Sequence, residues 1–323
     1  MDNLTHSLVG AVLGQAGLKR TTGLAMPALI IGANLPDVDA ACFFWLEGTE
    51  HLAFRRGITH GPPALVLLPL VLAGILWGWD RWQTRRGTRP EARLPVRFGW
   101  LYAMAFIGCL SHPFFDWLNV YGIRLLEPFS SQWFYGDTLF IIDVWLWALL
   151  IASVWWSRRR EKAGAEWMRS ARVGIAVALA YIGVNGFITF AAQNGLEEPS
   201  PILIVSPVPF AFWEREIIFG DGIGRFLIDG DLIESGVILP NCNLDAVAKR
   251  DSQVRAFQFW SRAPLVDYDP GRSGWVLRDA RFLHPLSRDR FEVDLPGWAC
   301  VTVEPYVSDG ELTVVGPPEP PAN

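Results

Sequence analysis

Hydrophobic runs fill the first 190 residues and predict a bundle of membrane helices. Six apolar runs, separated by polar loops, are expected to be helical: 4–17, 24–33, 62–79, 98–118, 138–156 and 173–192. The first two are shorter than the ~20 residues that a spanning helix needs. They are expected to form a tilted or re-entrant hairpin, or to be lengthened by buried flanks. Gly10, Gly14 and Gly17 would let the first helix approach a neighbour closely.

The pattern changes near residue 194 to short β-prone segments separated by Gly, Pro, Asn and Asp clusters. The predicted strands are 202–205, 216–219, 225–228, 254–260, 275–277, 291–295 and 300–303. The sequence therefore predicts an α-helical polytopic membrane domain of about five to six apolar helices over 1–193. A soluble all-β domain is expected over 194–315, and a disordered, proline-rich tail over 316–323.

Composition and charge agree with a multi-pass membrane protein and predict its orientation. The chain is 51% hydrophobic and 19% charged and has 16 tryptophans, typical of membrane domains with aromatic interface belts. The arginine-rich loops 80–97 and 158–172 belong in the cytoplasm by the positive-inside rule, and Lys19–Arg20 agrees. Because successive loops alternate between the two sides of the membrane, the 37–60 loop and the C-terminal domain are then expected outside the inner membrane. No basic face is evident, so membrane lipids and not nucleic acids are the expected partners.

The four cysteines, at 42, 109, 242 and 300, show no CxxC spacing. A zinc-finger or thioredoxin-like motif is therefore not indicated. Cys42 and Cys109 lie in apolar surroundings and are interpreted as packing residues. Cys242 and Cys300 share the C-terminal half and could form a disulfide there, a pairing that the sequence leaves open.

Histidines and acids gather on the predicted outer side of the membrane. His112 and Asp116 are four residues apart, which places both on one face of a helix. The other candidate ligands of this half are His6, Asp37, Asp39 and His60. Such a set suits one or two ions of Zn²⁺, with Mn²⁺ or Fe as alternatives, and these metals activate water for hydrolysis. Asp143, within an apolar run, is a further ligand or orients a histidine.

Structural roles compete with this interpretation at each position. His6 near a helix start is often a cap or an interfacial residue, and Asp37 and Asp39 can be turn formers. Asp137 fits a helix N-cap before Thr138. Metal binding gains weight over these structural roles because three of the four histidines in the membrane half have acidic neighbours on one predicted face of the membrane.

A set of short motifs follows this order along the chain: Thr5-His6-Ser7, Leu35-Pro36-Asp37-Val38-Asp39, Arg56-Gly57-Ile58-Thr59-His60, His112-Pro113-Phe114-Phe115-Asp116, Gly136-Asp137, Ile142-Asp143, Phe259-Trp260-Ser261-Arg262 and Leu277-Arg278-Asp279-Ala280-Arg281-Phe282. The set resembles the YdjM/YbcI-type inner-membrane metal-dependent hydrolases. The resemblance implies hydrolase activity more firmly than it implies a substrate. One departure is Gly61, where the family often carries serine. The order of ligands is also similar to that of zinc-dependent phospholipase C, which implies a phosphoester substrate, although a later His-x-x-x-Glu pair is missing.

The sequence thus predicts a membrane-bound, metal-dependent hydrolase acting at the outer face of the bilayer. Its candidate metal ligands are His6, Asp37, Asp39, His60, His112 and Asp116, and its candidate catalytic residues are Asp39, Arg55 and Arg56. Either arginine would hold the anionic group of a lipid-like or phosphoester substrate. The alternative is a non-enzymatic envelope protein with a structural metal and a partner-binding β domain. A transporter is less favoured, since no matching pair of broken helices recurs in two halves.

Overall fold

The computed structural model describes most of the chain as two compact units. The described residues are 1–195, 202–220, 226–228, 231–233, 240–283, 291–302, 306–308 and 311–313. Unit 1 comprises Met1–Ala40, Arg56–Ala192 and Pro207–Arg215, and unit 2 comprises Ala41–Arg55, Gln193–Ser206 and Glu216–Asn323. The tail predicted to be disordered, 316–323, lies outside the described residues. Each unit is assembled from several separate segments of the chain.

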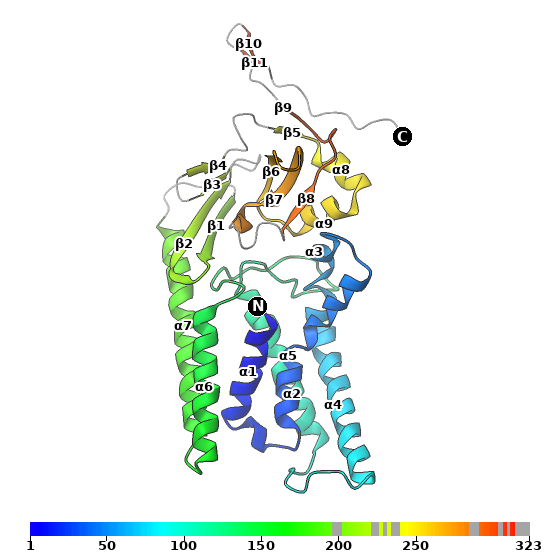
Figure 1. Ribbon diagram of the computed structural model, residues 1–323, viewed down its shortest axis with the longest axis vertical. Helices are drawn as coiled ribbons and strands as arrows, with labels where there is room; N and C mark the ends of the chain where they lie inside the picture. The colour runs from blue at the N-terminus through cyan, green and yellow to red at the C-terminus, as the bar shows by residue number, and fades with distance from the viewer. Residues whose placement is uncertain are drawn as a thin grey trace. The chain divides into compact units, whose positions relative to one another are not determined.

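Unit 1 is a bundle of helices that run side by side (Figure 1). Its helices are α1 (Asn3–Gln15), α2 (Ala25–Gly32), α4 (Pro62–Arg85), α5 (Phe98–Trp117), α6 (Val144–Lys162) and α7 (Met168–Asn194), with 3-10 helices η1 (Leu18–Arg20), η2 (Leu35–Phe44) and η3 (Ile58–His60). Three of these, α4, α5 and α7, are long and apolar enough to cross a membrane, and the bent pair α2 and η2 is a fourth candidate.

Three to four candidate spans are fewer than the five to six that the sequence predicts. The difference has two physical causes. At ~1.5 Å per residue α1 and α2 are only about 20 and 12 Å long, short of the ~30 Å hydrocarbon layer. The third helix lost from the count, α6, is apolar at first but ends in the charged turn Arg158–Lys162.

Small residues let α1 and α5 pack tightly against α2. A Cβ atom on Gly10 of α1 would lie 2.7 Å from the Leu29 carbonyl oxygen in α2, and one on Gly108 of α5 would lie 2.4 Å from the same atom. No larger residue fits at either position, so the backbones of α1 and α5 both reach α2. The predicted close approach at Gly10 is therefore confirmed. The core around this contact includes Leu101 and Met104, both buried.

The start of α6 corrects one prediction from the sequence. The helix begins at Val144, and Asp143 is its N-cap, with its carboxylate accepting from the Leu146 N–H at 2.8 Å. Asp137, predicted to be the N-cap, instead has a left-handed backbone with φ of 45°. Its carbonyl accepts from the Thr189 hydroxyl of α7 at 2.9 Å. The helix starts later because the second aspartate offers the better side-chain acceptor to the first turn.

Unit 2 contains small antiparallel sheets and short helices. Its elements, with the β1–β2 turn extending into unit 1, are β1 (Ile202–Val208), β2 (Ala211–Gly220), β3 (Phe226–Ile228), β4 (Asp231–Ile233), β5 (Pro240–Cys242), β6 (Pro264–Asp269), β7 (Gly274–Asp279), β8 (Glu292–Asp294), β9 (Cys300–Thr302), β10 (Tyr306–Ser308), β11 (Glu311–Thr313), α3 (Glu50–Phe54), α8 (Leu244–Arg250), α9 (Ser252–Trp260) and η4 (Ala280–Phe282). The sheet orders are β1-β2-β3-β4, β6-β7-β8, β5-β9 and β10-β11. In the register of β6 and β7, Pro264 lies opposite Asp279.

The helices of unit 2 mean that the predicted all-β domain is wrong in part. The segment 254–260, predicted to be a strand, belongs to α9. The Asp251 carboxylate accepts from the Gln253 and Val254 N–H groups and so starts a helix. Val254, Phe257 and Trp260 are all buried, a three-residue spacing that matches the helical repeat.

The cysteines behave as their sequence surroundings indicate. Cys242 and Cys300 lie opposite each other on β5 and β9 and form a disulfide, so the pairing left open by the sequence is confirmed. Cys42 and Cys109 are free and buried. The disulfide joins two short strands that have only three paired positions to hold them together.

Candidate metal centre

The predicted ligands of the first half converge within unit 1. His6 comes from α1, Asp37 and Asp39 come from η2, His60 from η3, and His112 and Asp116 from α5. Five of the six are buried, and Asp37 alone is half-buried. Charged and titratable groups are this deeply buried only when they are paired or hold a metal. The distances between their side-chain atoms show which of them could share one metal ion.

One group of three ligand atoms faces a common point. The Nε2 atoms of His60 and His112 lie 3.1 Å apart. Asp116 Oδ2 lies 3.5 Å from the first of these nitrogens and 3.4 Å from the second. Nitrogen and carboxylate oxygen are the atoms with which proteins bind zinc and related metals. The three residues thus have the composition of a metal site.

Hydrogen bonds on the far side of each ring fix which nitrogen is free. His112 Nδ1 lies 2.7 Å from the Ala33 carbonyl oxygen, which can only accept, so this nitrogen carries the proton. His60 Nδ1 lies 2.9 Å from the Thr59 hydroxyl oxygen, and that hydroxyl donates to Asp39 Oδ2 at 3.1 Å. The Nε2 atoms of both rings therefore face one carboxylate oxygen, an arrangement that suits a bound cation.

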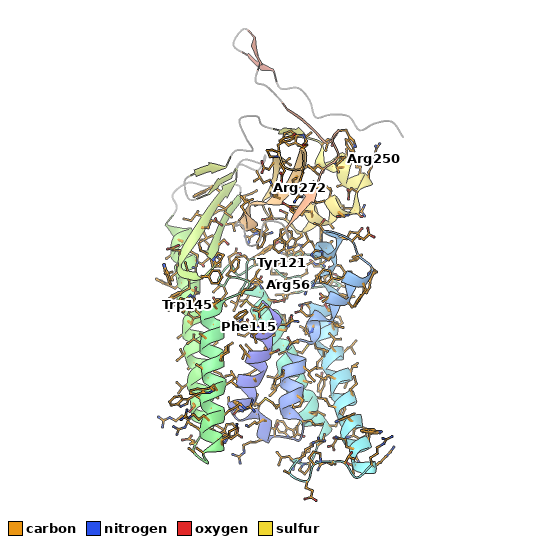
Figure 2. All side chains as sticks on the ribbon, viewed as in Figure 1. Arg56, Phe115, Tyr121, Trp145, Arg250 and Arg272 are labelled. Carbon is orange, nitrogen blue, oxygen red and sulfur yellow. A yellow bond between two sulfur atoms is a disulfide. The ribbon has the colours of Figure 1, made fainter. Side chains whose placement is uncertain are left out.

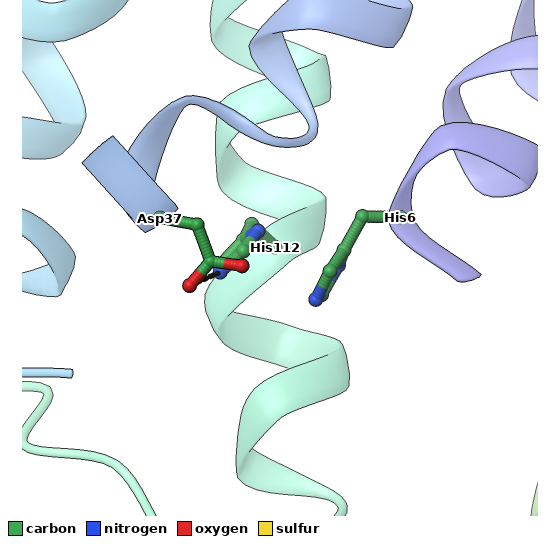
Figure 3. Close-up of side chains that lie close together, drawn as sticks. All are labelled: His6, Asp37 and His112. Atoms are coloured by element: carbon green, nitrogen blue, oxygen red, sulfur yellow. Dashed lines mark ion pairs between the residues drawn. The ribbon is translucent and has the colours of Figure 1, made fainter. Parts of the chain in front are cut away.

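A second group of ligand atoms adjoins the first and shares His112 with it. His6 from α1 and Asp37 from η2 lie on either side of His112 (Figure 3). Asp37 Oδ1 is 3.8 Å from His112 Nε2, and the rings of His6 and His112 are stacked with centroids 3.8 Å apart. His6 Nε2 lies 3.3 Å from Asp116 Oδ1. Neither nitrogen of His6 makes a well-formed hydrogen bond, although the residue is completely buried.

Arg56 contacts the same Asp116 oxygen that faces His60 and His112. Its Nε lies 3.1 Å from Asp116 Oδ2, and its Nη1 donates to the Asn119 side-chain oxygen at 3.0 Å. The guanidinium also lies over the ring of Tyr121, with its Cζ 4.3 Å from the centroid. Figure 2 labels these two residues. The α-ammonium of Met1 contacts the other oxygen of Asp116. Cationic groups therefore approach this carboxylate from two directions, as expected for a site of negative potential.

Asp39 lies behind His60 and not among the converging atoms. Its Oδ2 accepts from the Arg56 backbone N–H at 2.8 Å and from the Thr59 hydroxyl, and it is 3.6 Å from His60 Nδ1. A carboxylate in this position fixes the orientation and tautomer of a metal-binding histidine. Its contacts fit a positioning role better than a ligand role.

The comparisons with known proteins place this arrangement in a family. The family model described as YdjM inner membrane protein matches residues 1–192, which include every ligand described above. The chain belongs to the YdjM inner membrane protein family. No curated protein and no solved structure matches it. Together with its apolar helices, membership identifies this YdjM-family chain as a membrane protein.

Two residues assigned to the site from sequence have other surroundings in this YdjM-family chain. Arg55 belongs to unit 2, where its guanidinium lies 5.6 Å from the ring centroid of Phe43. Asp143 caps α6 and accepts from the Tyr181 hydroxyl at 2.9 Å. Among the described residues its hydrogen bonds involve none of the six candidate ligands. The roles of Arg55 as an anion holder and Asp143 as a partner of a histidine stay predictions.

Two supporting residues carry no role in the sequence analysis. Asn119 is fully buried, and its side-chain oxygen accepts from Arg56 and from the Tyr121 backbone N–H at 2.8 Å. Thr59 links His60 to Asp39. The sequence feature that could have pointed to Thr59 is its place beside His60 in one of the family motifs. For Asn119 the only such feature is its position three residues after Asp116.

Gly61, where the family resemblance expects serine, has a steric reason in this YdjM-family chain. A Cβ atom at Gly61 would lie 1.8 Å from the carbonyl oxygen of Glu127. The loop that follows α5 therefore passes directly over the residue next to His60. A serine would displace this loop, so the departure at Gly61 allows a close contact beside the metal centre.

Proposed function

We propose that this chain is a membrane-bound, metal-dependent hydrolase that acts on a lipid-like or phosphoester substrate at the outer face of the bilayer. One observation carries the proposal. Two buried imidazoles direct their Nε2 atoms at the Asp116 carboxylate, and a third buried histidine beside them has no well-formed hydrogen bond. Such unmet polar atoms cost free energy unless a metal is bound.

The proposed ligands are the residues of the two adjoining groups: His6, Asp37, His60, His112 and Asp116. Because His112 has one free nitrogen and belongs to both groups, it can serve only one ion directly. The site would therefore hold one ion, or two with His112 assigned to one of them. Zn²⁺ suits the histidine-rich donor set best, and Mn²⁺ suits the two carboxylates. The bound metal supplies Lewis acidity and a water of lowered pKa.

The chain's own residues prepare the site around that ion. Asp39 and Thr59 hold His60 in one tautomer, and the Ala33 carbonyl does the same for His112. Arg56 orients Asp116 and offsets its charge. Burial of these groups excludes bulk water, which strengthens each electrostatic interaction. Asp39 and Arg56 would thus act by positioning the ligands.

The depth of the site favours a substrate that comes from the membrane. His112 lies fourteen residues after Phe98, the first residue of α5, or roughly 21 Å along the helix. In a hydrocarbon layer of ~30 Å the ligands would lie below its outer edge. The least buried ligand is Asp37, and its neighbour Val38 is 52% exposed, so an apolar residue borders the accessible side.

Two features support placing this end of unit 1 and the C-terminal region outside the cytoplasm. The basic residues of the 80–97 and 158–172 loops lie at the opposite ends of α4, α5, α6 and α7 from the ligands, in agreement with the positive-inside rule. The Cys242–Cys300 disulfide of unit 2 is of a kind that persists in oxidising compartments. Both favour an extracytoplasmic C-terminal region.

The decisive experiment measures metal by elemental analysis on full-length protein purified in detergent without chelators. The wild type should hold one or two equivalents of zinc or manganese, and His112→Ala should hold nearly none. His51→Ala is the matched control, because His51 belongs to unit 2 and should leave metal content unchanged. Absence of metal from the wild type, even after reloading, would refute the proposal.

Hydrolysis of phospholipids and lipid phosphates then separates the enzyme from its alternative. An enzyme should release product with the wild type and not with His112→Ala. A non-enzymatic envelope protein would retain the metal in a closed, four-ligand site and show no turnover. X-ray absorption spectroscopy distinguishes the two, since a catalytic metal keeps a coordination position open to water.

A further inference from the structure

A groove between α1 and α6, whose basic end lies at the end of α6 away from the candidate ligands, has the features of a lipid site. Its volume is about 700 Å³, within the ~300–1,000 Å³ range of small-molecule sites. Leu8 of α1 forms one wall, and residues of α6 form the other. The α6 residues include Ile151, Trp155, Arg158 and Lys162, which follow one another at intervals of three or four and so occupy one helix face.

The groove changes from apolar to basic along its length. The first fourteen residues of α6, 144–157, include no charged side chain, whereas Arg158, Arg159 and Lys162 line the groove in the last turns. Trp155 lies at the change, with the Arg159 guanidinium 5.5 Å from its ring centroid. Tryptophan beside basic residues is typical of the boundary between hydrocarbon and headgroups. By the positive-inside rule this boundary is that of the cytoplasmic leaflet.

The three basic side chains of the groove differ from their neighbours in their partners. Lys19 pairs with Glu161, and Arg160 Nε donates to the Glu166 carbonyl oxygen at 2.7 Å. In the part of the chain that the structure describes, no carboxylate forms an ion pair with the three groove cations. A second groove, between α6 and α7, includes Glu166 beside its arginines. The first groove combines an apolar wall with three basic side chains and no acid, whereas the second has one acid beside two arginines.

We infer that the groove between α1 and α6 binds an acidic phospholipid of the cytoplasmic leaflet. One acyl chain would lie along Leu8 and Ile151, and the phosphate would lie against Arg158, Arg159 and Lys162. Basic pockets between membrane helices recognise anionic headgroups in this way. The inference is independent of the metal centre, because none of the groove residues contributes a candidate ligand.

Native mass spectrometry of the detergent-purified, full-length protein tests the lipid site by titration. The probes are dioleoylphosphatidylglycerol, the zwitterionic dioleoylphosphatidylcholine with the same chains, and glycerol phosphate as a headgroup without chains. The wild type should bind the acidic lipid at least tenfold more tightly than the zwitterionic one. Glycerol phosphate should not compete at equal concentration. Equal affinity for both lipids, or full competition by glycerol phosphate, would overturn the inference.

Charge-matched variants locate the site. Each basic residue near a membrane surface is worth ~1 kcal/mol, or roughly fivefold in affinity, so R158Q/R159Q/K162Q should bind the acidic lipid roughly a hundredfold more weakly. The control R81Q/R85Q/R86Q removes three exposed arginines from the same end of α4 and should change affinity less than twofold. An equal loss of affinity in both variants would mean that the acidic lipid responds to the general surface charge and not to this groove.

A second kind of variant tests the apolar part of the groove and guards against misfolding of the triple variant. Ile151→Trp fills the groove and retains every positive charge, so it should also abolish preferential binding of the acidic lipid. Lys162→Gln alone should cost roughly fivefold. Wild-type binding by Ile151→Trp would show that no acyl chain lies in the groove. Metal content should remain unchanged in all of these variants, which separates this result from the fate of the hydrolase proposal.

Discussion

Two buried aspartates, Asp116 in unit 1 and Asp279 in unit 2, show how differently the two regions treat charge. Both side chains are almost completely shielded from solvent, and both face an arginine. In unit 2 the Asp279 carboxylate accepts from the Arg281 Nε at 2.8 Å, from its Nη2 at 2.7 Å and from the Ser261 hydroxyl. Every oxygen of this carboxylate has a donor.

Asp116 has a less complete set of partners. The Met1 α-ammonium contacts its Oδ1 atom, whereas the Nε2 atoms of His60 and His112 lie 3.5 and 3.4 Å from its Oδ2 atom. Its Oδ2 atom makes no well-formed hydrogen bond, although Arg56 Nε lies 3.1 Å away. A buried polar cluster that is only partly satisfied is costly to a fold. The contrast fits a structural role for Asp279 and supports our proposal that the cluster at Asp116 is retained for a metal.

The comparison predicts that loss of Asp279 will have the largest effect on stability. Asp279→Ala leaves the fully buried guanidinium of Arg281 without its carboxylate, which should cost ~3–5 kcal/mol in unfolding free energy. Chemical denaturation of the full chain, followed by proteolysis of the C-terminal region, measures this. The control is Asp294→Ala, at an ion pair whose acid is 71% exposed, with an expected cost below ~1 kcal/mol. Equal costs at the two positions would contradict a structural role for the buried pair.

Acid should reproduce part of this effect. Burial alone would raise the pKa of Asp279, but Arg281 and the hydrogen bond from Ser261 hold that pKa below its usual value. The pair therefore contributes stability above the unfolded-state pKa of ~3.9, and the contribution is lost as pH falls through the folded-state pKa. The difference in unfolding free energy between the wild type and Asp279→Asn should shrink on acidification from about pH 7 to about pH 2.5. A difference that stays constant would exclude this linkage.

Asp39 is expected to affect metal binding through His60 and not as a ligand. Asparagine at this position keeps an oxygen for the Thr59 hydroxyl but loses the charge that fixes His60. Metal affinity should fall ~10–100-fold with the stoichiometry retained at saturation, as for other residues that orient ligands. Competition with a chelator measures the affinity, and Asp143→Asn should leave it unchanged. Loss of metal at saturation in Asp39→Asn would instead make Asp39 a ligand, as the sequence analysis proposed.

The grouping of the candidate ligands was predictable in part, because their spacing and their neighbours can be seen in the sequence. His112 and Asp116 share a helix face by their spacing alone, and His60 stands directly before an apolar run. The functional division between Asp37 and Asp39 was not predictable. It depends on η2 turning one carboxylate toward His112 and the other toward Thr59, which only the packed structure fixes. The role of Arg56 likewise depends on Asn119, a residue sixty-three positions away.

Errors in the fold have a similar origin. The short, β-prone segment 254–260 was predicted to be a strand, but the Asp251 cap and burial at three-residue spacing show that it is the helix α9. The start of α6 was placed at Thr138 because Asp137 looked like a cap, whereas Asp143 takes that role. In both cases an aspartate that binds backbone N–H groups decided the outcome. Hydrophobic pattern indicates where an element lies, and capping decides its type and its first residue.

The smallest predicted effect is the most direct test of the contrast between the two aspartates. His6→Phe retains a ring that can stack on His112, where the centroids are 3.8 Å apart, and removes two buried nitrogens without well-formed hydrogen bonds. If these nitrogens are retained for a metal, the metal-free protein should become more stable by ~1 kcal/mol, since an unsatisfied buried polar group costs ~1–3 kcal/mol.

The same variant should bind metal more weakly than the wild type, so stability and metal affinity should move in opposite directions. Thermal unfolding with chelator and with added zinc measures both: the wild type should gain stability from zinc, and His6→Phe should gain less. In unit 2 no such exchange is expected, because Asp279→Asn should lose stability and leave the response to zinc intact. If His6→Phe instead destabilises the metal-free protein, the two His6 nitrogens contribute to its stability and are not kept at the expense of stability for metal binding. The cluster at Asp116 would then be structural, like the pair at Asp279.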